Sequence, residues 1–408
     1  MNVSAHLRGR ILVPVARSFM FLEDGLLRIQ SGRVMSVESA PEDCTVPETH
    51  PGCVLIPAFT DSHLHYPQTR IVGSASGTLL TWLQQSTFPE ESRFANTPYA
   101  EQVAQEFCQA VLRSGVSAVA AYSSSHFSAT NVLFSALQKS GLKGLAGMVL
   151  MNREAPESLL VEVASAEAQM EQLIATWHGV DSHRLRYCVT PRFAISCTAE
   201  MLKMAGELAD RHELWVQSHV SENVDEVAFT QHLFPDSDGY LQLYRDFGLL
   251  HERSIYAHCI HFSQADWQLF ANSQAVVAHC PDSNFFLGSG CMQYQAARDA
   301  GARLSIGSDV GAGRSFSMRL AAGRAYDASL MVGNPVLPEE ILWTATIGGS
   351  IALGFNRSWQ EQGDADLCAI ACPPGLTKAQ LLDHIIFRHD EPHVRATYVR
   401  GQICYASE

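Results

Sequence analysis

The sequence predicts an α/β fold, a (β/α)8 TIM barrel with a small β-sandwich domain formed by both chain termini. Between residues 54 and 361, short β-branched runs alternate with longer helical patterns, which is typical of parallel βα units. Eight such runs occur, and eight strands with intervening helices favour a closed barrel over the alternative, an open doubly wound sheet. Residues 1–53 and 362–408 instead carry short strand-like pieces separated by Gly, Pro and Asp, so we assign both ends to the small β-domain.

The elements of the barrel can be placed in chain order. The runs expected to form its strands are Val54–Thr60, Val116–Tyr122, Leu145–Met151, Leu185–Thr190, Leu214–His219, Ile255–His258, Ala275–His279 and Leu304–Asp309. Between the first two, Thr97-Pro98 predicts the start of a helix that Gly115 ends. Ser263 and Asp266 have the spacing of a capping box, which predicts the start of another helix there.

Composition limits the possible partners. The 408 residues are 47% hydrophobic and 17% charged, which is typical of a folded globular protein. With 28 Lys+Arg against 42 Asp+Glu the net charge is −14, the wrong sign for binding a phosphate backbone, so no nucleic-acid partner is expected. Eleven cysteines without a C-x-x-C pair argue against a disulfide framework. No apolar run approaches the ~18 residues of a membrane span, and no signal-peptide pattern is visible. We therefore expect a cytoplasmic protein without a membrane partner.

Side chains that can bind a metal lie at the ends of several predicted strands. His63 and His65 follow the first run, and residues i and i+2 of an extended segment project to the same face, so both imidazoles can reach one metal ion. His219, His258 and Asp309 end the fifth, sixth and eighth runs. The carboxyl ends of barrel strands share one rim, which carries the active site in such folds. We therefore expect these side chains to converge there.

Two further residues near strand ends allow different interpretations. Glu222 lies three residues beyond His219, where a carboxyl beside the metal suits proton transfer. The same spacing fits an acidic residue in the first turn of the next helix, stabilised by the helix dipole. His279 also ends a run, but it precedes Cys280-Pro281 and has no part in this arrangement, so we interpret it as structural.

Several motifs, taken together and in order, are similar to those of a known family. They are Pro57–Gln68 (PAFTDSHLHYPQ), Leu80–Leu83 (LTWL) with Thr87–Glu90 (TFPE), Thr190–Phe193 (TPRF), His219–Asn223 (HVSEN), Ala257–His261 (AHCIH), Cys280-Pro281 with Ser283-Asn284, Leu287–Gly290 (LGSG) and Ser308–Gly313 (SDVGAG). The chain resembles the metal-dependent deaminases of the amidohydrolase superfamily, and more narrowly the guanine deaminase branch. The HYPQ, TFPE and PRF segments carry the narrower resemblance.

This resemblance implies hydrolytic deamination of guanine to xanthine and ammonia, with one zinc ion per chain. The implied zinc ligands are His63, His65, His219 and Asp309. The implied catalytic residues are Glu222 as proton shuttle, His258 as the group that orients the attacking water, and Asp309. The implied substrate-binding residues are Gln68, Arg192, Phe193, His219, Glu222 and His258. We also expect a homodimer that acts on a small-molecule purine.

Departures from the family pattern leave the substrate open. Asp282 stands where Thr is usual after Cys280-Pro281, and Ser308 where Thr commonly precedes Asp309. A deaminase of a pterin, 8-oxoguanine, cytosine or an amino-triazine would use the same metal centre. An alternative of another class is a scaffold protein that keeps the barrel without its metal. The presence of all four implied ligands and of Glu222 argues against that scaffold.

Overall fold

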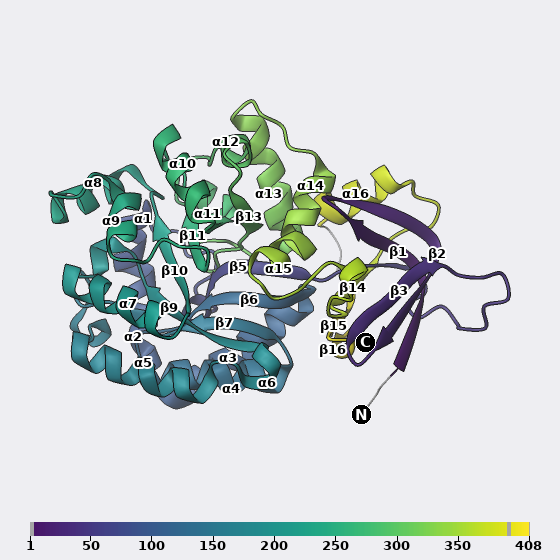
Figure 1. Ribbon diagram of the computed structural model, residues 1–408, viewed down its shortest axis with the longest axis horizontal. Helices are drawn as coiled ribbons and strands as arrows, with labels where there is room; N and C mark the ends of the chain where they lie inside the picture. The colour runs from purple at the N-terminus through teal and green to yellow at the C-terminus, as the bar shows by residue number, and fades with distance from the viewer. Residues whose placement is uncertain (1–3, 390–392, 408) are drawn as a thin grey trace.

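The structure is a computed structural model, and it describes residues 4–389 and 393–407. A barrel makes up the larger part, and a smaller β-domain built from both chain ends lies beside it, at the right of the view (Figure 1). Both parts of the predicted fold are therefore confirmed. The division of the chain at residues 53 and 362 stays a prediction.

Eight parallel strands form the barrel. They are β5 (Phe59–His65), β6 (Val116–Tyr122), β7 (Lys143–Gly147), β9 (Leu185–Pro191), β10 (Trp215–Val220), β11 (Ser254–His258), β12 (Val276–His279) and β13 (Arg303–Ile306), while the short β8 (Val149–Leu150) pairs with β9. Where β5 meets the chain after β13, the amide of Asp309 donates to the carbonyl of His63 at 2.8 Å, and the amide of His65 to that of Val310 at 2.7 Å. These bonds tie the first strand to the last, so the closed barrel is correct and the open sheet is wrong.

Helices surround the barrel, and short helices also lie within the loops that connect its elements. They are α1 (Leu79–Trp82), α2 (Phe88–Ser92), α3 (Thr97–Arg113), α4 (Phe127–Ser140), α5 (Val163–Trp177), α6 (Val180–His183), α7 (Ala199–Arg211), α8 (Val224–Leu233), α9 (Tyr240–Asp246), α10 (Gln264–Ser273), α11 (Pro281–Phe286), α12 (Tyr294–Asp299), α13 (Met318–Met331), α14 (Pro338–Trp343), α15 (Gly349–Ala352) and α16 (Lys378–Phe387). The predicted capping box is confirmed: the Ser263 side chain accepts from the amide of Asp266, whose carboxylate accepts the Ser263 amide.

Two predicted strands are each divided in two. The run Leu145–Met151 is broken at Met148 into β7 and the short β8. The run Val54–Thr60 was expected to be a single barrel strand, but β4 (Cys53–Pro57) pairs in the terminal sheet and β5 begins the barrel only at Phe59. Both strands are completely buried, so the apolar pattern continues across the break. Hydrophobicity alone could not locate it, because a run that is buried on both faces has no period to interrupt.

The small β-domain is one seven-stranded sheet in the order β16-β15-β14-β4-β1-β2-β3. Its other strands are β1 (Ser4–Val15), β2 (Ser18–Gln30), β3 (Arg33–Ser39), β14 (Leu367–Ala371), β15 (Val394–Val399) and β16 (Gln402–Ala406). Buried Lys143 of β7 connects this domain to the barrel through ion pairs with Asp364 at 2.8 Å and Asp366 at 2.5 Å.

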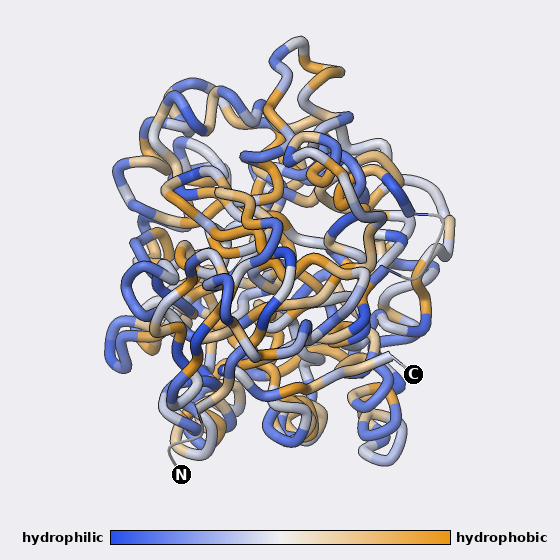
Figure 2. The backbone as a smooth tube through the Cα atoms, turned by 90° about the vertical axis from the view of Figure 1, so that its right-hand side faces the viewer, coloured by the Kyte–Doolittle hydropathy of each residue, from blue (hydrophilic) through white to orange (hydrophobic). Residues whose placement is uncertain are grey.

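The core follows the strands. In Figure 2 the hydrophobic segments gather at the centre of the molecule, and hydrophilic segments predominate among the outer helices and loops. Buried polar side chains interrupt this core at the carboxyl end of the barrel, where histidines and carboxylates lie at or after the ends of the strands. The site must therefore be sought at the polar end of the barrel core.

Among the described residues, no helix is long and apolar enough to cross a membrane.

Candidate active site

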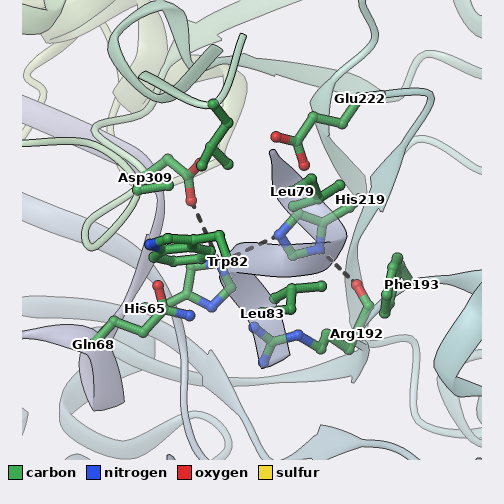
Figure 3. A pocket seen from close by; sticks show the side chains of 12 residues that line it. His65, Gln68, Leu79, Trp82, Leu83, Arg192, Phe193, His219, Glu222 and Asp309 are labelled. Carbon is green, nitrogen blue, oxygen red and sulfur yellow. Dashed lines mark hydrogen bonds and ion pairs between the residues drawn. The ribbon is translucent and has the colours of Figure 1, made fainter. Parts of the chain in front are cut away.

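Three histidines and one aspartate meet at the carboxyl end of the barrel strands. His63 and His65 end β5, His219 lies in β10, and Asp309 follows β13 by three residues. Their potential ligand atoms all lie within 4.8 Å of one another, and Figure 3 shows His65, His219 and Asp309 pointing toward one another. We call these four residues the metal cluster. The structure thus brings together the side chains that the sequence predicted as ligands.

A buried carboxylate that the sequence reasoning missed holds two of the ligand segments together. Oδ1 of Asp61, within β5, accepts the amide of Ser308 at 2.9 Å and the amide of His63 at 3.3 Å. Burial raises the pKa of Asp61 to about 7. Asp61 therefore connects the strand that carries His63 to the segment that carries Asp309. A charged residue inside an otherwise buried strand was the available signal.

The protonation pattern of the cluster fits a bound cation. Nδ1 of His219 lies 2.6 Å from the carbonyl oxygen of Arg192, which can only accept, so this nitrogen carries the hydrogen. Nε2 of His219 is then a bare lone pair, and it lies 3.3 Å from Nε2 of His65. Burial lowers the pKa of His219 well below its usual value and that of His65 to about 4, so both rings are neutral. Converging nitrogen lone pairs beside a carboxylate are the donor set that zinc prefers, and a fixed tautomer is typical of metal-binding histidines.

Glu222 and His258 border the cluster. Oε2 of Glu222 lies 3.5 Å from Nε2 of His258, which is 3.8 Å from Oδ2 of Asp309. Nδ1 of His258 donates to Oδ1 of Asn284 at 2.8 Å, so its other nitrogen faces the two carboxylates. Oε1 of Glu222 accepts from the Ser289 hydroxyl at 3.2 Å. Burial, and next the charge of Asp309, raise the pKa of Glu222 to about 8, so this carboxyl can hold or release a proton near neutral pH.

The helix-dipole interpretation of Glu222 is wrong. Helix α8 begins at Val224, and its N-terminal cap is Asn223, so Glu222 precedes the helix. Glu226 completes a capping box there and accepts the amides of Glu222 at 2.8 Å and Asn223 at 3.1 Å. The cap holds the backbone of Glu222 at the rim and leaves its side chain toward the cluster.

A cavity opens beside the cluster. Its walls combine His65, His219, Glu222 and Asp309 with apolar and aromatic side chains, and the remaining lining residues are Gln68, Leu79, Trp82, Leu83, Arg192, Phe193, Leu287 and Ala312 (Figure 3). Trp82 and Phe193 are both largely buried. Flat apolar walls with a few convergent polar groups suit a small planar heterocycle.

Of the six residues predicted to bind the substrate, five line this cavity, namely Gln68, Arg192, Phe193, His219 and Glu222, whereas His258 is not part of its wall. Gln68 ends a short 3-10 helix (Tyr66–Gln68) after β5, Arg192 follows β9, and Phe193 packs edge-on to His219 with ring centroids 6.4 Å apart. Behind them lies Glu91 of α2, which sequence reasoning missed. The quoted TFPE segment ends one residue earlier, at Glu90, and nothing in the local pattern separates the two adjacent acids.

Asp282 and His279, which the sequence analysis singled out, lie outside the cavity wall. Asp282 in α11 is buried and forms ion pairs with Arg314 at 2.5 Å and Arg324 at 3.4 Å, and it accepts the amide of Arg314 at 2.7 Å. It therefore anchors the loop that follows Asp309. His279 ends β12 with its ring near Tyr294, at a centroid distance of 5.9 Å.

Comparison with known proteins agrees with this geometry. Residues 54–404 match the model of the amidohydrolase family. The chain belongs to the amidohydrolase family. Its sequence is 34% identical to the guanine deaminase of Escherichia coli (strain K12), over 96% of this chain and 93% of that protein. It is 29% identical to the guanine deaminase of Dictyostelium discoideum, over 93% of this chain and 91% of that protein.

Solved structures give the same assignment. The structure of E. coli guanine deaminase superposes with a TM-score of 0.92 at 30% identity, and all of both chains are covered. A guanine deaminase from C. acetobutylicum with bound guanine in the active site superposes with a TM-score of 0.94 at 28% identity, covering 99% of this chain and all of that one. Within its family, the chain groups with the guanine deaminases and is a metal-dependent hydrolase that acts on C–N bonds.

Proposed function

We propose that this protein hydrolyses guanine to xanthine and ammonia, with one zinc ion held by His63, His65, His219 and Asp309. The observation that carries this proposal is the cavity itself, in which Arg192 and Gln68 stand opposite a proton-holding carboxyl beside the metal cluster. The four residues of the metal cluster would hold the zinc ion, which when bound would lower the pKa of water from 15.7 to about 7 and so make a nucleophile available at neutral pH.

Glu222 carries the protons in this proposal. Attack of water on the amino-bearing carbon requires a proton at the adjacent ring nitrogen and another on the departing amine. Glu222 lines the cavity, and the burial that raises the pKa of its carboxyl favours the protonated form from which it can donate. His258, held by Asn284, directs its free nitrogen toward Glu222 and Asp309, where it can orient the attacking water. The carboxylate of Asp309, 3.8 Å from Nε2 of His258, would offer an acceptor beside it.

The base is held at the opposite edge of the cavity. Arg192 offers donors to a ring carbonyl, and Gln68 offers both a donor and an acceptor. Phe193 and Trp82 provide apolar surface for the flat ring. Adenine has an amino group where guanine has its carbonyl, so adenine would present a donor to a donor at Arg192. The cavity therefore favours guanine over adenine.

A panel of substrates tests the proposal. Ammonia release is measured with guanine, adenine, pterin and 8-oxoguanine on one preparation, together with elemental analysis of the metal. We expect about one zinc per chain and the highest kcat/KM for guanine. A tenfold or greater preference for pterin or 8-oxoguanine would retain the reaction type but overturn the substrate.

The assembly is a separate part of the proposal. We infer a homodimer and a cytoplasmic location. Light scattering on the zinc-loaded protein should give a mass near twice the 44.7 kDa of one chain. A mass of one chain at micromolar concentration contradicts the dimer and leaves the active-site assignments unaffected.

A further inference from the structure

We propose that Glu91 is a positioning residue that sets the hydrogen-bonding pattern of the cavity's polar edge through Arg192 and Gln68. This inference rests on the proposed function, because it concerns the edge at which the base would be read. Glu91 does not line the cavity and is completely buried. It can therefore act on a ligand only through the side chains in front of it.

Glu91 fixes Arg192 by a two-point contact. Nη1 of Arg192 donates to Oε1 of Glu91 at 2.9 Å and to Oε2 at 2.8 Å, and the exposed fractions of the two side chains are 3% and 1%. Phe88 lies on the same face of α2, three residues before Glu91, and its ring centroid is 5.7 Å from the guanidinium carbon. Helix α2 therefore supplies both a counter-charge and an apolar support. The other nitrogens of the guanidinium have no hydrogen-bond partner among the described residues, which leaves them available to a ligand.

Glu91 also fixes the orientation of the Gln68 side-chain amide. Nε2 of Gln68 donates to Oε1 of Glu91 at 3.0 Å, and Oε1 of Gln68 accepts the amide of Gly311 at 3.0 Å. A carboxylate only accepts and a backbone amide only donates, so a flipped Gln68 would lose both bonds. The substrate therefore meets one remaining hydrogen and one remaining lone pair of Gln68 in a set order.

Charge balance adds a preference for a neutral ligand. The buried guanidinium already has its counter-ion in Glu91, so the polar edge as a whole carries no net charge. A neutral ring carbonyl can accept from Arg192 without displacing that ion pair, whereas an anion would compete with Glu91 for the same charge. The arrangement matches an uncharged amide-type heterocycle.

The neighbouring residue offers a matched control. Glu90 lies on the same short helix and is also buried, but its carboxylate pairs with Arg93 at 2.8 Å and accepts from the hydroxyl of Tyr99, outside the cavity. Glu91→Gln and Glu90→Gln therefore remove the same charge from adjacent buried positions. Only the first removes it from the polar edge.

Kinetics of the zinc-loaded variants test the inference. Glu91→Gln should raise KM for guanine about 10- to 100-fold, with a much smaller change in kcat and unchanged zinc content, because the polar edge is remote from the reacting carbon. Glu91→Asp, which keeps the charge, should recover part of the affinity. Glu90→Gln should leave KM within about threefold of the wild-type value. Equal KM values for Glu91→Gln and Glu90→Gln would overturn the proposal.

A double-mutant cycle separates positioning from general damage to the fold. If Glu91 acts partly through Arg192, then adding Glu91→Gln to Arg192→Ala should cost less affinity than Glu91→Gln costs alone, the remainder being its effect through Gln68, whereas independent damage would add fully. Full additivity would overturn the proposal. Both experiments use whichever heterocycle the wild-type protein turns over fastest. A wild-type protein inactive on guanine therefore refutes the proposed function, while an uncoupled Glu91 refutes only this inference.

Discussion

The metal cluster and the polar edge of the cavity, formed by Gln68 and Arg192 with Glu91 behind them, lie at the same cavity but are built from different parts of the fold. The cluster takes its side chains from β5, from β10 and from the turn after β13, whose positions the hydrogen-bonded barrel fixes. The polar edge takes Gln68 from a 3-10 turn, Arg192 from the chain after β9 and Glu91 from the five-residue helix α2. The type of reaction therefore depends on the barrel strands. The choice of substrate depends on the short segments attached to them.

Arg192 is the residue at which the two regions meet. Its backbone carbonyl accepts from Nδ1 of His219, while its side chain pairs with Glu91. Side-chain substitutions at this position should therefore leave the cluster intact, because alanine keeps the carbonyl. If the two regions are separable, variants in one should change metal content and those in the other should change KM.

The largest effect is expected within the cluster. His65→Ala removes a buried neutral ligand that lies 3.3 Å from Nε2 of His219, so metal and activity should be lost together, with kcat reduced more than about 1,000-fold. Elemental analysis and ammonia release measure the two quantities. His279→Ala is the control: it also removes a buried strand-end histidine, but outside the cluster, and should retain the metal. Full zinc in a folded, inactive His65→Ala protein would contradict the ligand assignment.

Glu222→Gln is expected to separate proton transfer from metal binding. The substitution keeps the size of the side chain and its contact with Ser289 but removes the titratable carboxyl. General acid–base catalysis contributes typically 10²–10⁴-fold, so kcat should fall by about that factor or more with zinc retained. A variant with near-native kcat would show that another group carries the proton.

Arg192→Ala should weaken the polar edge and leave the metal cluster intact. Loss of a buried donor to the substrate costs roughly 1–3 kcal/mol, or about 5- to 150-fold in kcat/KM, and more for a charged donor. The buried carboxylate of Glu91 would also lose its counter-ion, which costs about 3–5 kcal/mol of folding stability and should lower Tm. Metal content should not change. A variant that loses zinc would show that the two regions are not separable.

The same division explains what could be predicted from the sequence. The barrel and its ligands were visible because strand ends in a parallel barrel share one rim, so a polar residue after each apolar run has a predictable position. His63, His65, His219 and Asp309 follow this rule. The small β-domain was visible as well, although the break between β4 and β5 was hidden inside one continuous apolar run.

The residues that were missed have partners distant in the sequence. Glu91 and Arg192 are separated by 101 positions, and Asp61 and Ser308 by 247. Periodicity describes which face of an element is buried but not which element it is buried against. The assignment of Gln68, Arg192 and Phe193 to substrate binding came from the family resemblance. Without it, the same sequence is equally consistent with a solvent-exposed arginine and a phenylalanine of the core.

The smallest effect is expected at Phe193, which follows Arg192 in the chain and whose ring packs against His219 of the metal cluster. It lines the cavity with an exposed fraction of 5% and packs edge-on to His219 at an interplanar angle of 68°. Phe193→Leu keeps most of the apolar surface and loses the aromatic interaction with a bound ring, which is worth about 0.5–1.5 kcal/mol. KM for guanine should therefore rise roughly 2- to 12-fold, with kcat nearly unchanged.

The zinc content of Phe193→Leu then shows how independent the metal cluster is of the rest of the cavity wall. The orientation of His219 is fixed by the carbonyl of Arg192, and the contact with Phe193 is the weaker constraint, so zinc occupancy should equal that of the wild-type protein. Titration with a competing chelator provides the measurement. A tenfold or greater loss of zinc affinity would show that the aromatic wall also holds a ligand in place. In that case the choice of ligand and the metal chemistry would share a structural element, and the separation argued from the strands and loops would fail at this residue.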